Sequence, residues 1–429
     1  MAELRSGPAQ DRLPPLWLSA AALTAAITVV FGVVRWVDHF VSDPYEEDFR
    51  LNYVAAKIGL THGWSHIYDL DLERQLSASF SPVGSVIDSM HNYVTPPPLA
   101  WLVAPLTPFS LPTGYLVWTL GSVAALIAAW WLVSPGKGLA RVTLLLIALA
   151  LWPMHYTFWL GQTAVVSIIC LALTWWLLER ERWAQAGAVM AFALFIKPQV
   201  LLLLPVALLV SGRWRPVLYC ALASGILGVI SVALLGSHGI AAYFNSVNFT
   251  KGNPIHSVMT YAWFGSGLVA TGIEVGLGLV ALVLAWYRRD RMDLVFALGI
   301  VGSTASAFYL HEYDPAVFVV PAWILLRSRL SVPQRAWLLI GIVAAQFIAI
   351  GVFKPMLLWE AGWIGMLGIE PWLAGLDQDR LLTAAVGPRE GWRSRSLQRP
   401  PHRTLPSAGA PTGSSNQTRA TSGASGGPD

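Results

Sequence analysis

Charge is what this sequence has least of. Only 12% of its 429 residues are Asp, Glu, Lys or Arg, about half the share of a soluble globular domain, whereas 55% are hydrophobic. The chain has two cysteines, Cys170 and Cys220, and both fall inside apolar runs, where packing is a better account than a disulfide or a metal site. The net charge of +4 comes from short basic intervals and the C-terminal part, so it indicates membrane orientation and no nucleic-acid partner.

Several catalytic and cofactor motifs are also missing. The sequence contains no phosphate-binding glycine-rich loop, no His/Cys zinc spacing and no Gly-x-Ser-x-Gly elbow. Asp69-Leu-Asp71 is similar to the Asp-x-Asp of nucleotide-sugar enzymes that bind a metal, but this pattern is short and common. We therefore expect no cofactor and assign no metal ligands.

Apolar runs follow one another from Leu16 to about Leu376. Because a membrane-spanning helix needs about 20 apolar residues, these runs predict an all-α polytopic membrane protein with about 12 transmembrane helices. The expected spans are Leu16–Val37, Gly114–Val133, Ala140–Phe158, Thr163–Leu178, Ala184–Ile196, Val200–Val210, Pro216–Leu235, Leu268–Tyr287, Leu294–Leu310, Pro315–Leu326, Ala336–Phe353 and, more weakly, Met356–Leu376.

The remaining segments complete the predicted organisation. Residues 1–15 form a cytoplasmic N-terminus, 16–376 the transmembrane domain, and 377–429 a polar tail without apolar periodicity that we expect to be disordered and cytoplasmic. Within the first outer loop (38–98), Phe49–Gly59 and Leu70–Phe80 have the pattern of amphipathic interfacial helices. Pro96–Pro112 is short and rich in proline, and we interpret it as interfacial or re-entrant.

The basic residues between spans indicate which loops share a side. By the positive-inside rule the cytoplasmic intervals are Lys137/Arg141, Arg180/Arg182, Arg213/Arg215, Arg288–Arg291 and Arg327/Arg329/Arg335. The opposite side then receives the acidic loop, Gly161-Gln162, Lys197-Pro198-Gln199, the loop Gly236–Ser266 and His311-Glu312-Tyr313-Asp314.

The acidic loop is the first candidate for chemistry. Between Asp38 and Asp88 it carries nine of the chain's 24 acidic residues and only three basic ones. Asp48, flanked by Glu46 and Glu47, is placed to act as a general base on a hydroxyl. An acidic helix N-terminus, favoured by the helix dipole, explains the same spacing and is the simpler account.

Two polar residues interrupt apolar stretches on the same predicted side. Lys197 is an ionisable residue within a span and is a natural partner for a phosphate, although a lysine that snorkels from a span end fits equally well. Gln162 can bind substrate or bridge helices, and its position favours the bridge.

The sequence His311-Glu312-Tyr313-Asp314 places a histidine and a carboxylate three positions apart. On one interpretation His311 and Asp314 hold a phosphate or a sugar, with Asp314 orienting the imidazole. On the other, they are a structural pair at the start of the next span.

Six short motifs occur in a fixed order, namely Asp48-Phe-Arg-Leu-Asn-Tyr53, Ile67-Tyr-Asp69, Tyr93-Val-Thr-Pro-Pro-Pro98, Gly161-Gln162, Ile196-Lys-Pro-Gln199 and His311-Glu-Tyr-Asp314. Together they resemble glycosyltransferase family 87, multispanning GT-C enzymes that include polyprenyl-phosphate-mannose-dependent mannosyltransferases. The resemblance covers about Leu16–Phe353. This chain departs from the usual pattern at Tyr93-Val-Thr-Pro, where Tyr-Pro-Pro is more common, and at Glu312, where proline is more common.

The resemblance implies a GT-C fold and assigns roles to the motif residues. Asp48 corresponds to the general base, and the substrate-binding candidates are Lys197, His311, Asp314, Tyr313, Gln162, Tyr93, Tyr53 and Arg50. The implied reaction moves a hexose, with mannose the expected sugar, from a polyprenyl-phosphate donor to a hydroxyl of a glycolipid or glycan, with inversion. It takes place at the extracytoplasmic face of the plasma membrane, among membrane lipids. A polytopic transporter or flippase without glycosyl transfer is the alternative, and internal repeats of the spans would favour it.

Overall fold

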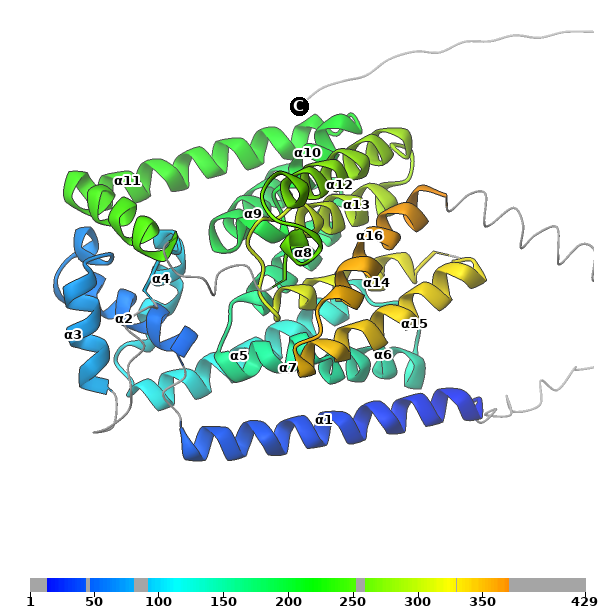
Figure 1. Ribbon diagram of the computed structural model, residues 1–429, viewed down its shortest axis with the longest axis horizontal. Helices are drawn as coiled ribbons and strands as arrows, with labels where there is room; N and C mark the ends of the chain where they lie inside the picture. Colours follow the sequence, from blue (N-terminus) through cyan, green and yellow to red (C-terminus); the bar gives the residue numbers. More distant parts are fainter. Residues whose placement is uncertain (1–13, 44–46, 81–91, 252–258, 329, 370–429) are drawn as a thin grey trace, which may run out of the picture. The chain divides into compact units, whose positions relative to one another are not determined.

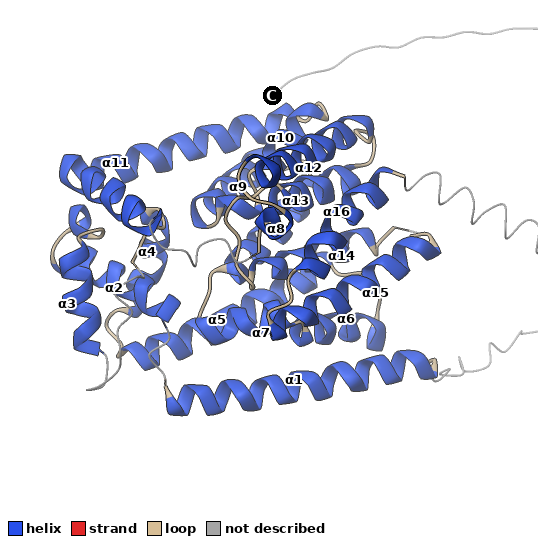
Figure 2. Ribbon diagram, viewed as in Figure 1, coloured by secondary structure: helices blue, strands red, loops and turns tan. Residues whose placement is uncertain are grey.

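A computed structural model describes residues 14–43, 47–80, 92–251, 259–328 and 330–369. Within these ranges helices are the only regular secondary structure, as Figures 1 and 2 show, and the predicted all-helical class is confirmed. The predicted N-terminal segment up to residue 13, Glu46 and the tail 377–429 lie outside the described residues.

The described helices follow in chain order. They are α1 (Leu16–Ser42), α2 (Glu47–Thr61), η1 (Trp64–His66), α3 (Leu70–Phe80), α4 (Pro97–Val103), η2 (Ala104–Leu106), α5 (Leu111–Val133), α6 (Gly138–Ala150), α7 (Trp152–Leu160), α8 (Ala164–Leu178), α9 (Trp183–Ile196), η3 (Pro198–Val200), α10 (Leu203–Val210), α11 (Trp214–Lys251), η5 (Tyr261–Phe264), α12 (Leu268–Tyr287), α13 (Met292–Ala305), η6 (Asp314–Phe318), α14 (Val319–Leu325), α15 (Val332–Phe347), η7 (Ile348–Ile350) and α16 (Lys354–Gly368).

Five described helices are long and apolar enough to cross a membrane: α1, α5, α11, α12 and α15 with η7. The bent pair α6–α7 makes a sixth if it counts as one span. The predicted number of about 12 spans is therefore not confirmed. Several of the other apolar runs form helices of 10–17 residues, such as α8 and α13. Their side chains are buried against other helices, so apolar content there serves protein packing as much as lipid contact.

The bend between α6 and α7 has a local cause. The two axes differ by 61° across Leu151, whose backbone is extended at φ −67° and ψ 134°. Pro153 occupies the second position of α7 and has no N–H to continue the hydrogen bonding of α6. The expected span Ala140–Phe158 is thus interrupted at its centre.

Helix α11 corrects one prediction. The loop expected from Gly236 to Ser266 is helical as far as Lys251, beyond a break at Gly236 with φ 59° and ψ −169°. Ala242 is buried in a hydrophobic cluster of the outer-loop helices, and Ile240 and Tyr243 contact the same cluster. These contacts stabilise a helix in a stretch whose polar composition predicts a loop.

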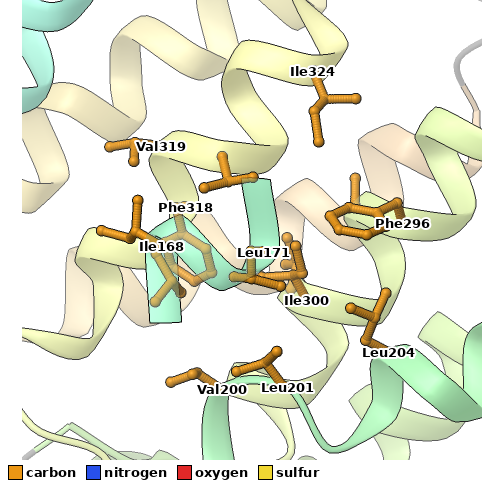
Figure 3. Close-up of a cluster of buried hydrophobic side chains, with 14 of the residues drawn as sticks. Ile168, Leu171, Val200, Leu201, Leu204, Phe296, Ile300, Phe318, Val319 and Ile324 are labelled. Carbon is orange, nitrogen blue, oxygen red and sulfur yellow. The ribbon is translucent and has the colours of Figure 1, made fainter. Parts of the chain in front are cut away.

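The core has two parts. The larger one lies between α8, α10, α13 and α14, where Ile168, Leu171, Phe296 and Ile300 interlock, as Figure 3 shows. The smaller one lies under α2, η1, α4 and the second half of α11 and includes Phe49, a residue that is fully buried.

The two helices predicted in the first outer loop are present. Helix α2 covers the predicted Phe49–Gly59, and α3 has the predicted bounds Leu70–Phe80. The proline-rich segment forms α4 and η2, ten residues from Pro97 to Leu106. At 1.5 Å per residue this helix is about 15 Å long, half of the hydrocarbon thickness, which agrees with the prediction that it does not cross the membrane.

Candidate active site

A cavity of about 440 Å³ lies among the loop ends of these helices. Its walls come from the start of α2, the segment before α4, the end of α7, the turn between α9 and η3, the second half of α11 and the segment before η6. Of the predicted site residues it brings together Asp48, Tyr93, Gln162, Lys197, His311 and Tyr313. The loops that the basic intervals assigned to one side therefore meet around one cavity.

Three of the five basic intervals also contact one another. Arg327 forms an ion pair with Glu179 at 3.0 Å, which joins the interval after α14 to the interval after α8. The hydroxyl of Ser328 donates to Oδ2 of Asp293 at 2.8 Å, which joins the interval after α14 to the interval after α12. The sorting of loops by charge thus agrees with their contacts.

Asp48 lies in the first turn of α2, and its position is set by the next residue. Phe49 is fully buried, with its ring 5.8 Å from the ring of Tyr115 and 6.0 Å from that of Trp118, both on α5. Asn52 donates a hydrogen bond to the backbone carbonyl of Asp48 at 3.0 Å. The start of α2 is therefore anchored to α5, with Asp48 in the cavity wall.

Gly161 allows the end of α7 to approach α2. It ends α7 with φ 65°, a left-handed conformation that favours glycine. A Cβ added there would lie 2.7 Å from Cβ of Phe49 and 3.2 Å from the ring of Tyr115. The Gly161-Gln162 motif therefore brings α7 against the residue next to Asp48, and the side chain of Gln162 lines the cavity.

Replacing Gly161 with alanine is expected to lower both stability and activity. The left-handed backbone costs about 1–2 kcal/mol with a Cβ present, and the contact with Phe49 must also give way. Displacement of a catalytic group by about 1 Å costs on the order of 10²-fold in rate, so the loss of transfer should exceed the loss of folded protein. Thermal unfolding and transfer rate measure the two effects. Gly121→Ala on α5, where an added Cβ meets nothing within 4 Å, is the matched control and should change neither. Equal behaviour of the two variants would contradict this role for Gly161.

Lys197 ends α9 at the proline that begins η3, and its side chain points into the protein. Only 5% of the residue is exposed, and Nζ lies 2.6 Å from Oδ1 of the fully buried Asp314. Nζ also lies 4.1 Å from the ring centroid of Tyr313. This geometry favours a buried ion pair at the cavity over a lysine that snorkels to a span end.

Asp314 closes a tight turn with His311. The backbone N–H of Asp314 donates to the carbonyl of His311 at 3.0 Å, and the N–H of His311 donates to Oδ2 of Asp314 at 2.8 Å. The imidazole Nε2 is hydrogen-bonded to the hydroxyl of Tyr309 at 2.8 Å. One of the two interpretations of the sequence had Asp314 orienting the imidazole, and the other had a structural pair. In the structure Asp314 holds the backbone of His311 and the ammonium of Lys197, and Tyr309 contacts the ring.

Two tyrosines of this segment, Tyr309 and Tyr313, are affected by the carboxylates of Asp48 and Asp314. Burial raises the pKa of Tyr313, and the carboxylates of Asp48 and Asp314 raise it further. Burial likewise raises the pKa of Tyr309, followed by the same two carboxylates. Both hydroxyls therefore stay protonated and can donate hydrogen bonds. Asp48, Tyr309 and Tyr313 all line the same cavity.

Glu312 adds a carboxyl group to the cavity wall. Burial raises its pKa, which favours the protonated form compared with an exposed glutamate. Because Glu312 stands where the resemblance leads us to expect proline, it makes this cavity more polar.

Three predicted site residues are not among the cavity-lining residues in the described part of the chain: Arg50, Tyr53 and Asp314. Tyr53 is fully buried, and its hydroxyl donates to the backbone carbonyls of Thr107 and Phe109 at 3.2 and 2.7 Å. Arg50 is also buried on α2. Tyr53 thus ties α2 to the turn after η2 and helps position Asp48.

The wall segment Tyr93–Pro96 is held by residues that the sequence analysis did not single out. Glu73, on α3, accepts a hydrogen bond from the backbone N–H of Tyr93 at 2.7 Å, and the hydroxyl of Ser246, on α11, donates to the carbonyl of Tyr93 at 2.8 Å. Tyr68 donates to the carbonyl of Thr95 at 2.8 Å. Glu73, Ser246 and Tyr68 are distant in sequence from the backbone groups that they bind, so no local pattern predicts these contacts.

Glu73 makes this wall sensitive to pH. Burial raises its pKa from 4.5 to about 8. Since the folded-state pKa is above the unfolded value, the stability that protonated Glu73 provides is complete below pH 4.5 and is lost as the pH rises to about 8.

Glu73→Gln should remove this loss and gain stability over the wild type between pH 5 and pH 8, on the order of a few kcal/mol. Thermal unfolding at both pH values measures it. Asp71→Asn, at a fully exposed position on the same helix, is the control and should follow the wild type. An unchanged pH profile in Glu73→Gln would contradict the assignment.

The carboxylates of Asp69 and Asp71 do not converge on one point. Asp71 is fully exposed and lies 3.8 Å from Arg74, whereas Asp69 contacts His66 at 2.7 Å and His238 at 3.0 Å. The Asp-x-Asp interpretation of this pair is therefore not supported by the geometry.

These observations define a helical membrane protein with a polar cavity in which an acidic residue and a buried lysine share one space, an arrangement suited to group transfer. The model of glycosyltransferase family 87 matches residues 93–310, about half of the chain. The chain belongs to this family and is a membrane glycosyltransferase. The matched range contains Gln162 and Lys197, whereas Asp48 and the His311–Asp314 turn lie outside it. No curated protein and no solved structure matches the chain.

Proposed function

We propose that this glycosyltransferase moves a hexose, mannose in the first instance, from a polyprenyl-phosphate donor to a hydroxyl of a glycolipid or glycan. The observation that carries the proposal is the common cavity of Asp48 and Lys197. Transfer between a lipid-linked donor and a hydroxyl needs a proton acceptor on one side of the sugar and a positive charge at the leaving phosphate on the other. One cavity supplies both.

The leaving group is the polyprenyl phosphate. It departs already ionised, so neither a nucleotide nor a divalent metal is needed to stabilise it. Lys197 is buried and forms an ion pair with Asp314, which fixes the position of its side chain. The ammonium group is therefore pre-positioned for a phosphate oxygen. His311 and the protonated hydroxyls of Tyr309 and Tyr313 add hydrogen-bond donors on the same wall.

Asp48 acts on the acceptor. Its carboxylate takes the proton from the acceptor hydroxyl as the oxygen attacks the anomeric carbon. The C–O bond to the acceptor forms as the bond to the phosphate breaks, and the anomeric configuration inverts in this single displacement. Residues of α2 and α4 line the acceptor side of the cavity and take space that water would otherwise occupy, which limits hydrolysis of the donor.

The sorting of loops by charge supports an extracytoplasmic cavity in a plasma-membrane protein, because three of the five basic intervals contact one another and none of the basic-interval residues lines the cavity in the described part of the chain. The GT-C arrangement of the spans belongs to the same proposal.

A transfer assay tests this function. The full-length protein in lipid nanodiscs is incubated with a radiolabelled polyprenyl-phosphate mannose and an envelope lipid extract as acceptor, and in parallel with a nucleotide-linked mannose. We expect label to enter a glycolipid or glycan only from the polyprenyl-phosphate donor. Transfer from the nucleotide sugar alone, or from no lipid-linked sugar in a panel of hexoses and pentoses, would overturn the proposal. In the second case, movement of the intact lipid-linked sugar across the membrane would favour a flippase.

A further inference from the structure

Outside the transfer cavity, two histidines and an aspartate converge where α11 meets the outer-loop helices. Nδ1 of His66 lies 2.7 Å from Oδ2 of Asp69, and Nε2 of His238 lies 3.0 and 3.2 Å from the two oxygens of the same carboxylate. The three ligand-type atoms all lie within 4.8 Å of one another, and the two imidazole rings are 4.8 Å apart. None of the three residues lines the transfer cavity.

Two glycines of α11, Gly236 and Gly239, allow this helix to lie close to η1 beside the cluster. The break at Gly236 reorients α11 just before His238. At Gly239 an added Cβ would lie 2.8 Å from the carbonyl oxygen of Ser65, so only glycine allows α11 to lie so near η1. Beyond it, the ring of Tyr243 stands 5.0 Å from that of Tyr68. The position of His238 beside His66 and Asp69 is thus fixed on both sides of the cluster.

We propose that His66, Asp69 and His238 bind a zinc ion that joins α11 to the η1–α3 segment. Two imidazole nitrogens and a carboxylate oxygen are a ligand set that Zn²⁺ accepts, with water in the fourth position. In a tetrahedral site ligand atoms are separated by about 3.3 Å. The His–Asp contacts of 2.7–3.2 Å need to open only slightly, and the two imidazole nitrogens already lie within 4.8 Å of each other. His238 is the most exposed of the three, which leaves room for the water.

The site has a structural role, separate from sugar transfer. His66 and Asp69 are three residues apart, whereas His238 is 169 positions from Asp69. A metal there closes a long loop and holds the second half of α11, which supplies Tyr243 to the cavity wall and Ser246 to the backbone of Tyr93. Without the metal, the same three side chains form only a hydrogen-bond network.

The test measures zinc in the full-length protein without a polyhistidine tag. We expect the wild type, purified in detergent, to retain one zinc ion per chain by elemental analysis. Removal with a chelator should lower the thermal unfolding temperature, and Zn²⁺ should restore it, whereas Mg²⁺ and Ca²⁺ should not. Co²⁺ should give the visible absorption of a low-coordinate nitrogen and oxygen site. His238→Ala, at an exposed position, and Asp69→Asn should lose the metal and its effect on unfolding. His62→Ala is the matched control, an exposed histidine four residues before His66, and should bind as the wild type does.

Two results would overturn the proposal. One is a wild-type protein that holds no zinc and gains no stability from Zn²⁺. The other is zinc binding that persists unchanged in both His238→Ala and Asp69→Asn. Because the readouts are metal content and unfolding temperature, they do not depend on the donor, the acceptor or any transfer activity.

Discussion

Asp48→Asn is expected to reduce transfer from a polyprenyl-phosphate sugar by about 10²–10⁴-fold, the usual contribution of a general base. Asparagine has nearly the same size and cannot take a proton from the acceptor hydroxyl. Phe49 and Tyr53, both on α2, keep their contacts with α5 and with the turn after η2 in this variant, so it should still fold. Thermal unfolding checks this. The rate is measured by incorporation of label under single-turnover conditions.

The neighbouring acids provide the controls for this experiment. Glu46→Gln and Glu47→Gln alter charge in the same run and should retain most of the transfer rate. If either variant loses activity while Asp48→Asn keeps it, the base is the neighbouring glutamate. If all three variants remain active, no carboxylate of this run acts as the base.

Lys197→Met should have the second large effect, on both stability and transfer. It leaves Asp314 fully buried without its ammonium partner, and breaking a buried pair in this way costs about 3–5 kcal/mol. Removal of one preorganised charge at the leaving group should reduce the transfer rate by about 10²–10³-fold. Unfolding experiments and rate measurements with the same preparations separate the two losses.

The double variant Lys197→Met/Asp314→Asn separates the effect of Lys197 on stability from its effect on the transfer rate. Without either charge the interior no longer holds an unpaired ion, and the neutral amide can still accept from the N–H of His311. Most of the stability should return, whereas the transfer rate should stay low. Recovery of transfer along with stability would mean that Lys197 serves the fold alone.

The sequence predicted a helix well where the amphipathic pattern of its own residues is sufficient to specify it. The bounds of α3 matched, and α2 was expected. The segment 96–112 was interpreted only as interfacial or re-entrant, and its helical part, α4 with η2, was not predicted. The number of spans was not confirmed, because an apolar run has the same composition whether its side chains contact lipid or, as in α13, other helices. The second half of α11 was predicted as a loop because its helical structure depends on contacts with residues far away in sequence.

The same distinction applies to the site. Asp48 stood out in the acidic loop, Lys197 because its charge interrupts an apolar stretch, and His311 because a carboxylate follows it three positions later. The structure places all three on one cavity. Tyr309, Glu73 and His238 carry no such local signal. Each acquires its role from a partner in the folded chain, such as the N–H of Tyr93 for Glu73, 20 residues away. Tyr53 was interpreted as a binding residue because of its motif, whereas its hydroxyl is used to hold α2.

The location of the bound donor is the most direct test of the account. A structure of the full-length protein with a non-transferable phosphonate analogue of a polyprenyl-phosphate sugar should contain the phosphonate beside Lys197 and His311, with the anomeric carbon turned toward Asp48. A phosphonate bound outside this cavity, or a sugar whose anomeric carbon faces away from Asp48, would contradict the roles of Lys197 at the leaving phosphate and of Asp48 as general base.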